Sequence, residues 1–311
     1  MLQRARISSA PGFIAALDQS GGSTPHALAL YGLDDIRGDS DDMYRLVHAM
    51  RTRIITSKGF AGDRIIGAIL FEDTVMNRRV KGLPTATHLW EEKNVVPFLK
   101  IDRGLETERD GVQLMKQVPD LSKLLAKCGR DTISMPTPTS EGSPSAAEAM
   151  ATGDTHTEPI VDTTTDGESG PGDCIFGTKA RSVIRHANAS GIKAIVAQQF
   201  AVAAQVLAAG LVPIVEPEVD IHAEDKAEAE GMLQCELGFY LGALAPGQLV
   251  GLRLTLPEDP SAWMRGLFLL IQMCTRAGPY LTARIVEAPT RLQPIKPTPV
   301  YSSTSLDQQR S

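Results

Sequence analysis

Charged residues stand at the ends of five short apolar segments of the chain. They are Asp18 (FIAALD), Lys100 and Asp102 (VVPFLKID), Lys179 and Arg181 (IFGTKAR), Glu216 and Glu218 (LVPIVEPE), and Arg253 (LVGLRLT). A desolvated lysine beside other cations has a lowered pKa and can attack a carbonyl carbon. A glutamate among cations can act as general acid and base. This mixture of cations and carboxylates predicts an anionic, oxygen-rich substrate.

Arg253 lies inside an almost wholly apolar run, QLVGLRLTLP over 248–257. Such a run is typical of a strand that is buried on both faces. A guanidinium stays protonated in proteins, and burying it without a partner is very costly. We therefore expect Arg253 to face Glu216, Glu218 or a phosphate group.

Short apolar strands and helical patterns alternate along the chain at intervals of roughly 35 residues, which predicts a parallel α/β fold. The expected strands are Phe13–Asp18, Ile65–Phe71, Val95–Asp102, Ile175–Arg181, Leu211–Glu218 and Leu249–Thr255, and the expected helices are Met43–Ile55, Ile192–Ala208 and Ala223–Leu244. Charged strand ends that converge favour a (β/α)8 TIM barrel. A doubly wound sheet is less favoured, because DQSGGST (18–24) resembles a glycine-rich phosphate loop only faintly.

Two segments interrupt this alternation. Residues 129–173 are rich in Thr, Ser, Pro, Gly and acidic residues, so they cannot offset their ordering entropy by burial, and we expect a disordered insertion. After Pro257 the chain is shorter than the roughly 70 residues that two further βα units would need. The barrel is thus expected to be incomplete or irregular after the sixth strand, with Gly266–Cys274 and Leu281–Val286 as candidate substitute strands.

The expected division of the chain follows from these interruptions. It comprises an N-terminal part of the barrel (1–128), the insertion (129–173), the continuation of the barrel (174–257) and a diverged C-terminal tail (258–311).

Composition excludes several classes of function. The 311 residues carry a net charge of −6, which argues against binding to nucleic acid or to an anionic membrane surface. No apolar run approaches the roughly 20 residues that span a bilayer, so we expect a cytoplasmic protein. The four cysteines show no CxxC spacing and the six histidines are scattered singly, so neither a metal nor a cofactor is expected.

Nine blocks of sequence, in order, resemble the class I fructose-bisphosphate aldolase family in its shorter bacterial-type branch. They are FIAALDQSGGSTP, MRTRIITS, GAILFEDT, VVPFLKIDRGL, GVQLMK, FGTKARSVI, VAQQF, GLVPIVEPEVDI and LVGLRLTLP. The resemblance covers about Gly12–Lys127 and Cys174–Pro257. It implies a metal-independent, Schiff-base lyase of glycolysis that cleaves fructose 1,6-bisphosphate to dihydroxyacetone phosphate and glyceraldehyde 3-phosphate. A phosphorylated sugar is the implied partner, and a homo-oligomer is left open.

The resemblance also implies roles for individual residues in catalysis. Glu216 would be the general acid and base, and Asp18 would orient the substrate and take part in proton transfer at the carbon–carbon cleavage. Lys179, together with Arg181, would bind the substrate and its second phosphate.

Five further residues would bind substrate by the same resemblance. Ser20 and Ser23 lie in a loop that helps to hold a phosphate. Lys100 would contact substrate oxygens, Arg181 would bind the second phosphate, and Glu218 would support Glu216.

The sequence departs from the family at two places. The position of the Schiff-base lysine is Arg253, and an arginine does not become the neutral amine that forms an imine. The SGGYS-like phosphate loop and the SFSRAL-like arginine that the family places after Pro257 are also missing. A second hypothesis is therefore a catalytically inactive aldolase-like sugar-phosphate binder or a mis-assembled gene product. Imine formation by Lys179 is a third option.

Overall fold

The computed structural model describes residues 2–19, 24–29, 32, 40–128, 175–257 and 280–287. The predicted insertion over 129–173 lies outside the described residues, as do Ser20, Ser23 and the candidate strand Gly266–Cys274.

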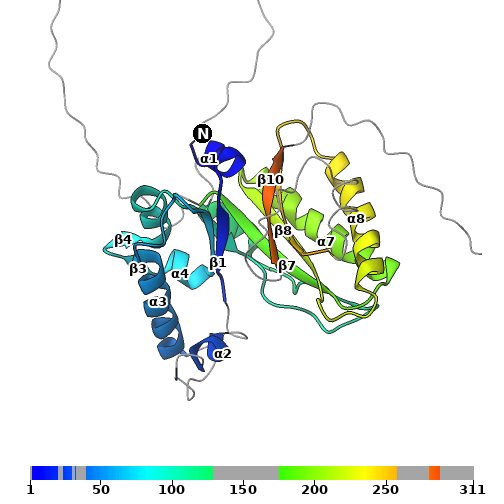
Figure 1. Cartoon of the computed structure of the whole chain (residues 1–311), viewed down its shortest axis with the longest axis horizontal. Helices are drawn as coiled ribbons and strands as arrows, with labels where there is room; N and C mark the ends of the chain where they lie inside the picture. The colour runs from blue at the N-terminus through cyan, green and yellow to red at the C-terminus, as the bar shows by residue number, and fades with distance from the viewer. Residues whose placement is uncertain are drawn as a thin grey trace, which may run out of the picture.

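A curled parallel sheet forms the centre of the protein (Figure 1). Its parallel strands pair in chain order: β1 (Phe13–Leu17), β2 (Ile65–Leu70), β5 (Val96–Lys100), β7 (Gly177–Ile184), β8 (Val212–Val219) and β9 (Leu249–Thr255). All of them were predicted, because each is a short apolar run, and all except the edge strand β1 are buried on both faces. The short strand β6 (Val112–Gln113) pairs antiparallel with β7.

Helices precede and connect these strands. They are α1 (Leu2–Ser9), α2 (Thr24–Ala29), α3 (Asp41–Thr56), α4 (Glu72–Met76), α5 (Thr85–Thr87), a π-helical turn (His88–Glu92), α6 (Leu121–Cys128), α7 (Ala189–Ala208) and α8 (Lys226–Gly242), with a small hairpin of β3 (Arg79–Val80) and β4 (Leu83–Pro84). Polar caps set two of the helix starts. The side chain of Ser40 accepts a hydrogen bond from the Met43 amide, and that of Asn188 accepts one from the Gly191 amide.

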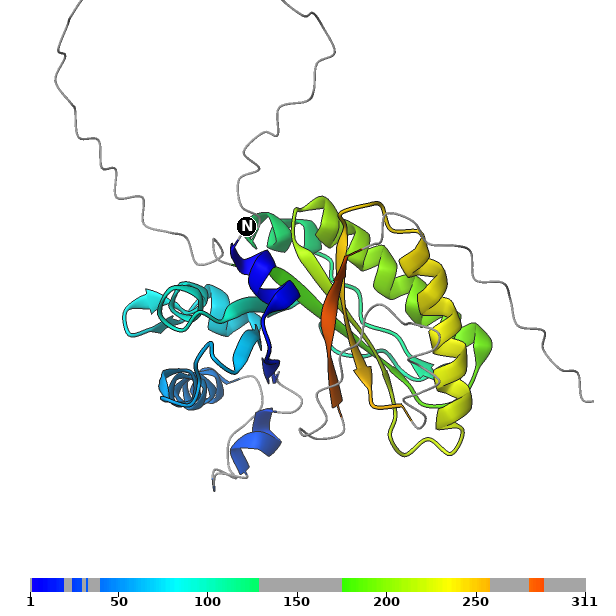
Figure 2. The ribbon, with the colours of Figure 1, turned by 45° about the horizontal axis from the view of Figure 1, so that its top comes forward.

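By length and composition α7 is apolar enough to cross a membrane, which differs from the expectation that no segment would be. Its place in the fold explains the apolar sequence. It packs against the sheet and against the neighbouring helix α8 (Figure 2), and Ile192, Ile195 and Val196 are fully buried there beside Leu233 and Leu237 of α8. A helix that is covered on two sides is apolar on two sides, so this is a core helix.

A separate apolar cluster fills the N-terminal end of the sheet. Ile7 of α1 packs there with residues near the starts of successive strands, namely Ile14, Ile66, Val96, Val212 and Leu249. Sequence reasoning missed α1, yet this helix closes the end of the sheet opposite to the charged strand ends.

The strand after β9 runs in the opposite direction. β10 (Tyr280–Glu287) is antiparallel to β9, with Tyr280 opposite Thr255 and Glu287 opposite Leu249. In the described part of the chain the strand order therefore ends at β10 without returning to β1. The prediction of a barrel that is irregular after the sixth strand is confirmed, and Leu281–Val286 is confirmed as a strand.

Candidate active site

An open cavity of about 360 Å³ lies at the C-terminal ends of the parallel strands. We call it the mouth. Five strands and the residues that follow them supply its charged lining: Asp18 after β1, Lys100 and Asp102 from β5, Lys179 and Arg181 from β7, Glu216 and Glu218 from β8, and Arg253 from β9. All the predicted site residues that the structure describes thus converge on one site. Ser20 and Ser23 lie outside the described residues.

The strand register explains why these side chains meet. Residues two apart on a strand point to the same face, so Lys179 and Arg181 share a face. Arg181 pairs in register with Glu216 on the neighbouring strand, and Lys179 pairs with Lys100 on the other side. The register thereby brings two lysines together between β5 and β7, and places a cation beside a carboxylate between β7 and β8.

Lys179 lies at the centre of the buried charges. Its Nζ is 2.6 Å from Asp18 Oδ2 and 2.7 Å from Glu216 Oε2, and the residue is only 1% exposed. Burial disfavours the ammonium, but the negative charges of Asp18, Glu216 and Asp102 outweigh it and raise the pKa of Lys179. Lys179 is therefore an ammonium at neutral pH when no substrate is bound.

The two carboxyl groups beside Lys179 differ in their protonation behaviour. Burial works against the ionised form of Asp18, yet the charge and hydrogen bond of Lys179 outweigh it and lower the pKa of Asp18. Burial raises the pKa of Glu216, and the positive charges of Lys179 and Arg253 offset only part of that rise. Two carboxyl groups whose pKa values move apart are suited to different roles: Asp18 as an anion, Glu216 as a group that exchanges a proton.

Arg253 faces Glu216, which is one of the three partners that the sequence left open. A guanidinium nitrogen of Arg253 forms an ion pair with Glu216 Oε1, while Glu216 Oε2 faces Lys179. Glu216 therefore bridges two cations inside the mouth. The charge in the apolar strand is neutralised by a carboxylate from the neighbouring strand.

Two further ion pairs complete the lining. Arg181 grips Glu218 through two nitrogens, with Nε 2.6 Å and a terminal nitrogen 3.1 Å from the carboxylate oxygens. Lys100 Nζ lies 2.5 Å from Asp102 Oδ1, and the other oxygen of Asp102 accepts a hydrogen bond from the Arg181 amide. Asp102 thus joins β5 to β7 at the mouth.

Arg51 on α3 is a buried cation that sequence reasoning missed. It is only 2% exposed, and it donates hydrogen bonds to the Gln19 carbonyl and to the Thr74 hydroxyl. The apolar periodicity of the helix gave no sign of it, because an arginine next to an apolar face is usually exposed along its polar edge.

The described residues contain no group of three or more His, Cys, Asp or Glu side chains that could hold a metal ion. The carboxylates of the mouth are instead neutralised by lysine and arginine.

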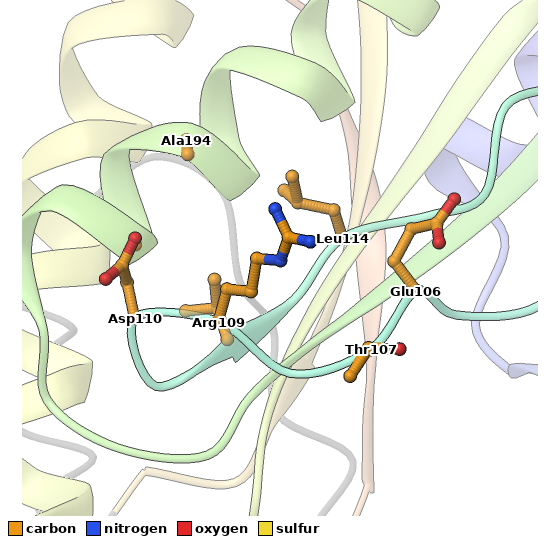
Figure 3. Close-up of a pocket in the computed structure, with 8 residues that line it drawn as sticks. Glu106, Thr107, Arg109, Asp110, Leu114 and Ala194 are labelled. Carbon is orange, nitrogen blue, oxygen red and sulfur yellow. The ribbon is translucent and has the colours of Figure 1, made fainter.

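A second cavity of about 350 Å³ lies between the loop after β5 and the start of α7 (Figure 3). The polar residues on its wall are Glu106, Thr107, Arg109 and Asp110, which are all exposed. It shares no lining residue with the mouth.

The curled parallel sheet with charged strand ends defines a protein of the (β/α)-barrel class. No protein-family model matches the chain. Over 262 residues the chain is 49% identical to the curated fructose-bisphosphate aldolase class 1 of Synechocystis sp.. The matched region covers 84% of this chain and 73% of the relative. The chain therefore belongs to the class 1 fructose-bisphosphate aldolase family, and the resemblance seen in the sequence is confirmed.

A solved structure supports the fold independently. It is a fructose-bisphosphate aldolase from Plasmodium falciparum in a ternary complex with TRAP and a small-molecule inhibitor, with a TM-score of 0.51 and 18% sequence identity. The similarity covers 78% of this chain, and it spans 57% of the length of the aldolase. At this identity the match shows the barrel-like fold alone.

Proposed function

We propose that this chain binds fructose 1,6-bisphosphate in the mouth and cleaves it, without a metal, to dihydroxyacetone phosphate and glyceraldehyde 3-phosphate. The observation that carries this proposal is the contact of Lys179 with both Asp18 and Glu216 in a mouth that also holds three further cations. A substrate with two phosphates needs cations, and retro-aldol cleavage needs a base and an acid within reach of one carbon chain.

Lys179 is the group that we assign to imine formation in this chain. Arg253 stays protonated, whereas Lys179 can pass its proton to a carboxylate that lies within 2.7 Å. In this step Nζ bonds to the substrate carbonyl carbon, Glu216 takes up and returns protons, and water leaves. Because the pKa of Lys179 is raised, the neutral amine is rare and slow turnover is expected.

Asp18 and the remaining cations take the other roles. Asp18, an anion at neutral pH, accepts the proton of the hydroxyl next to the bond that breaks. Lys100 and Arg181, which flank Lys179 on the lining, bind substrate oxygens and a phosphate, and Glu218 holds Arg181 in place. Ser20 and Ser23 remain predicted ligands of a phosphate.

A coupled assay for triose phosphate release with excess chelator tests the proposal. Borohydride reduction in the presence of dihydroxyacetone phosphate, followed by peptide mass spectrometry, tests the imine. We expect slow cleavage that resists the chelator and an adduct on Lys179. Loss of activity with the chelator, or cleavage without any trapped adduct, would contradict this mechanism.

A second candidate function is a sugar-phosphate binder without turnover. The ion pair between Arg253 and Glu216 favours it, because it places a non-nucleophilic cation against the proposed acid and base. Binding of fructose 1,6-bisphosphate in isothermal titration calorimetry, with neither cleavage nor adduct, would establish this function in place of the first.

We also propose that the protein works in the cytoplasm, as expected of a glycolytic enzyme, and that it forms a homo-oligomer. Sedimentation analysis of the full chain tests the second point, and a single monomeric species would refute it. The division at residues 129–173 and 258–311 remains a prediction. A variant that lacks 129–173 should bind fructose 1,6-bisphosphate as the full chain does.

A further inference from the structure

We infer that Arg51 is a positioning residue, which holds the backbone directly after β1 so that Asp18 and Gln19 keep their places in the mouth. The inference rests on the proposed function, since it concerns the binding of fructose 1,6-bisphosphate at that mouth. Arg51 is not among the described residues that line the mouth, and it is hydrogen-bonded to one of them, Gln19.

The hydrogen bonds of Arg51 link the ends of two strands. One guanidinium nitrogen donates to the carbonyl oxygen of Gln19 at 2.6 Å, directly after Asp18. The other terminal nitrogen donates to the Thr74 hydroxyl at 2.7 Å, in the helix that follows β2. Because α3 connects β1 to β2, its Arg51 reaches both chain segments where they leave the sheet.

Arg51 is fixed in this position by its surroundings. Residue Thr74 is itself 1% exposed, and the ring of Phe71 lies 6.0 Å from the guanidinium carbon. Among the described residues the buried Nε of Arg51 has no hydrogen-bond partner. The guanidinium thus leaves one donor unsatisfied while its two terminal nitrogens bind Gln19 and Thr74. Apolar packing of the helix alone would not require such a costly buried charge.

The positive charge of Arg51 also stabilises the ionised Asp18. Burial lowers the pKa of Arg51 to about 10, against the attraction of Asp18 and Asp73, so the guanidinium is still charged at neutral pH. Asp18 forms an ion pair with Lys179 of β7 and lies within the positive fields of Arg253 of β9 and Lys100 of β5. Arg51 of α3 is a further positive charge that attracts Asp18. Arg51 therefore supports both the place and the charge of Asp18.

The test compares four variants of the full chain: Arg51→Met, Arg51→Lys, Thr74→Val and, as control, Arg45→Met. Arg45 lies on the same helix, but it is exposed and pairs with Asp42. Affinity for fructose 1,6-bisphosphate is measured by isothermal titration calorimetry between pH 5 and 9, and thermal melting is followed for each variant. Cleavage rates are added wherever cleavage occurs.

We expect Arg51→Met to weaken binding by about tenfold, the size of one lost charge-assisted hydrogen bond. Arg51→Lys keeps the charge and one donor, so it should recover part of the affinity. Thr74→Val should weaken binding by less than Arg51→Met, and Arg45→Met should bind as the wild type does. The acidic limb of the affinity profile should move to higher pH in Arg51→Met and stay in place in Arg51→Lys.

A purely structural role would lower the melting temperature without changing affinity or its pH profile in the folded variants, and this result would overturn the inference. If Arg51→Met does not fold, equal affinities of Arg51→Lys, Thr74→Val and the wild type would overturn it as well. Failure of the wild type to bind fructose 1,6-bisphosphate would overturn the proposed function, and this inference with it.

Discussion

Lys179 and Glu216 lie on neighbouring strands, with Nζ and Oε2 2.7 Å apart and the residues only 1% and 2% exposed. Each charge is buried because the other is present. Removing the ammonium takes away the ion-pair partner of Asp18 and leaves Glu216 with Arg253 alone, and breaking a buried pair in this way typically costs about 3–5 kcal/mol.

We therefore expect Lys179→Met to lower the free energy of unfolding by about 3–5 kcal/mol at pH 7. Urea denaturation followed by circular dichroism measures this change. Lys193→Met is the matched control, since Lys193 is exposed on α7, and it should change stability by less than about 0.5 kcal/mol. A loss no larger than that of the control would show that the pair is not buried.

Replacing Arg253 by lysine should restore an amine that can form an imine at the end of β9. Turnover of fructose 1,6-bisphosphate is expected to rise at least tenfold, or roughly 1.4 kcal/mol off the barrier. The borohydride adduct should move from Lys179 to position 253, as peptide mass spectrometry would show.

Arg181→Lys is the matched control for this exchange. It replaces a guanidinium that grips Glu218 through two nitrogens, so it should weaken binding and raise no rate. An Arg253→Lys variant with unchanged turnover would locate the limitation outside the imine step.

The opposite pKa shifts of Asp18 and Glu216 give opposite slopes of stability against pH. The pKa of Asp18 is lowered, so its contribution is present above its ordinary value of 3.8 and is lost as the pH falls through the folded pKa. The pKa of Glu216 is raised, so its folded form binds the proton more tightly, and stability falls as the pH rises above 4.5 toward the folded pKa.

Urea denaturation between pH 2.5 and 7 tests both signs. The Asp18→Asn variant should lose the decrease in stability below pH 3.8, while Glu216→Gln should lose the decrease above pH 4.5. Asp42→Asn, at an exposed position of α3, should keep the wild-type profile. Profiles of both site variants that follow the wild type would refute the assigned directions.

Gly177 is required by the close approach of β7 to β8. A Cβ atom at this position would lie 2.0 Å from the carbonyl oxygen of Val212. Gly177→Ala should therefore destabilise the protein by several kcal/mol, or roughly the cost of forcing backbone apart in a packed core. Gly231→Ala, in α8 with nothing within 4 Å, should instead stabilise it by about 0.5–1 kcal/mol. Thermal melting of both variants decides between these outcomes.

The parallel strands and the mouth could be predicted from the sequence, because each strand is marked by a local pattern of apolar residues that ends in a charged residue. A buried strand must be apolar along its length, so the charge at its end marks where it meets solvent, as at Asp18 and Lys179. Parallel strands carry their carboxyl ends to one edge, and convergence follows without any knowledge of contacts. For the same reason the expected partners of Arg253 could be limited to Glu216, Glu218 or a phosphate group.

Other features depend on long-range packing and left no local signal. The burial of Arg51 requires acceptors from Gln19 and Thr74, which are far from it in sequence. Helix α1 has few apolar residues, and only the packing of Ile7 against strand starts makes it part of the core. The composition of β10 also does not predict its direction, because parallel and antiparallel edge strands use similar residues.

The antiparallel direction of β10 determines which segments of the chain can supply residues to the mouth. A parallel seventh strand would deliver the residues after it to the rim where Lys179 and Arg253 lie. Here Tyr280 stands at that rim beside Thr255, and Glu287 ends at the opposite rim beside Leu249. β10 therefore runs away from that rim, so among the described residues only the parallel strands and the residues directly after them present charged groups to the mouth.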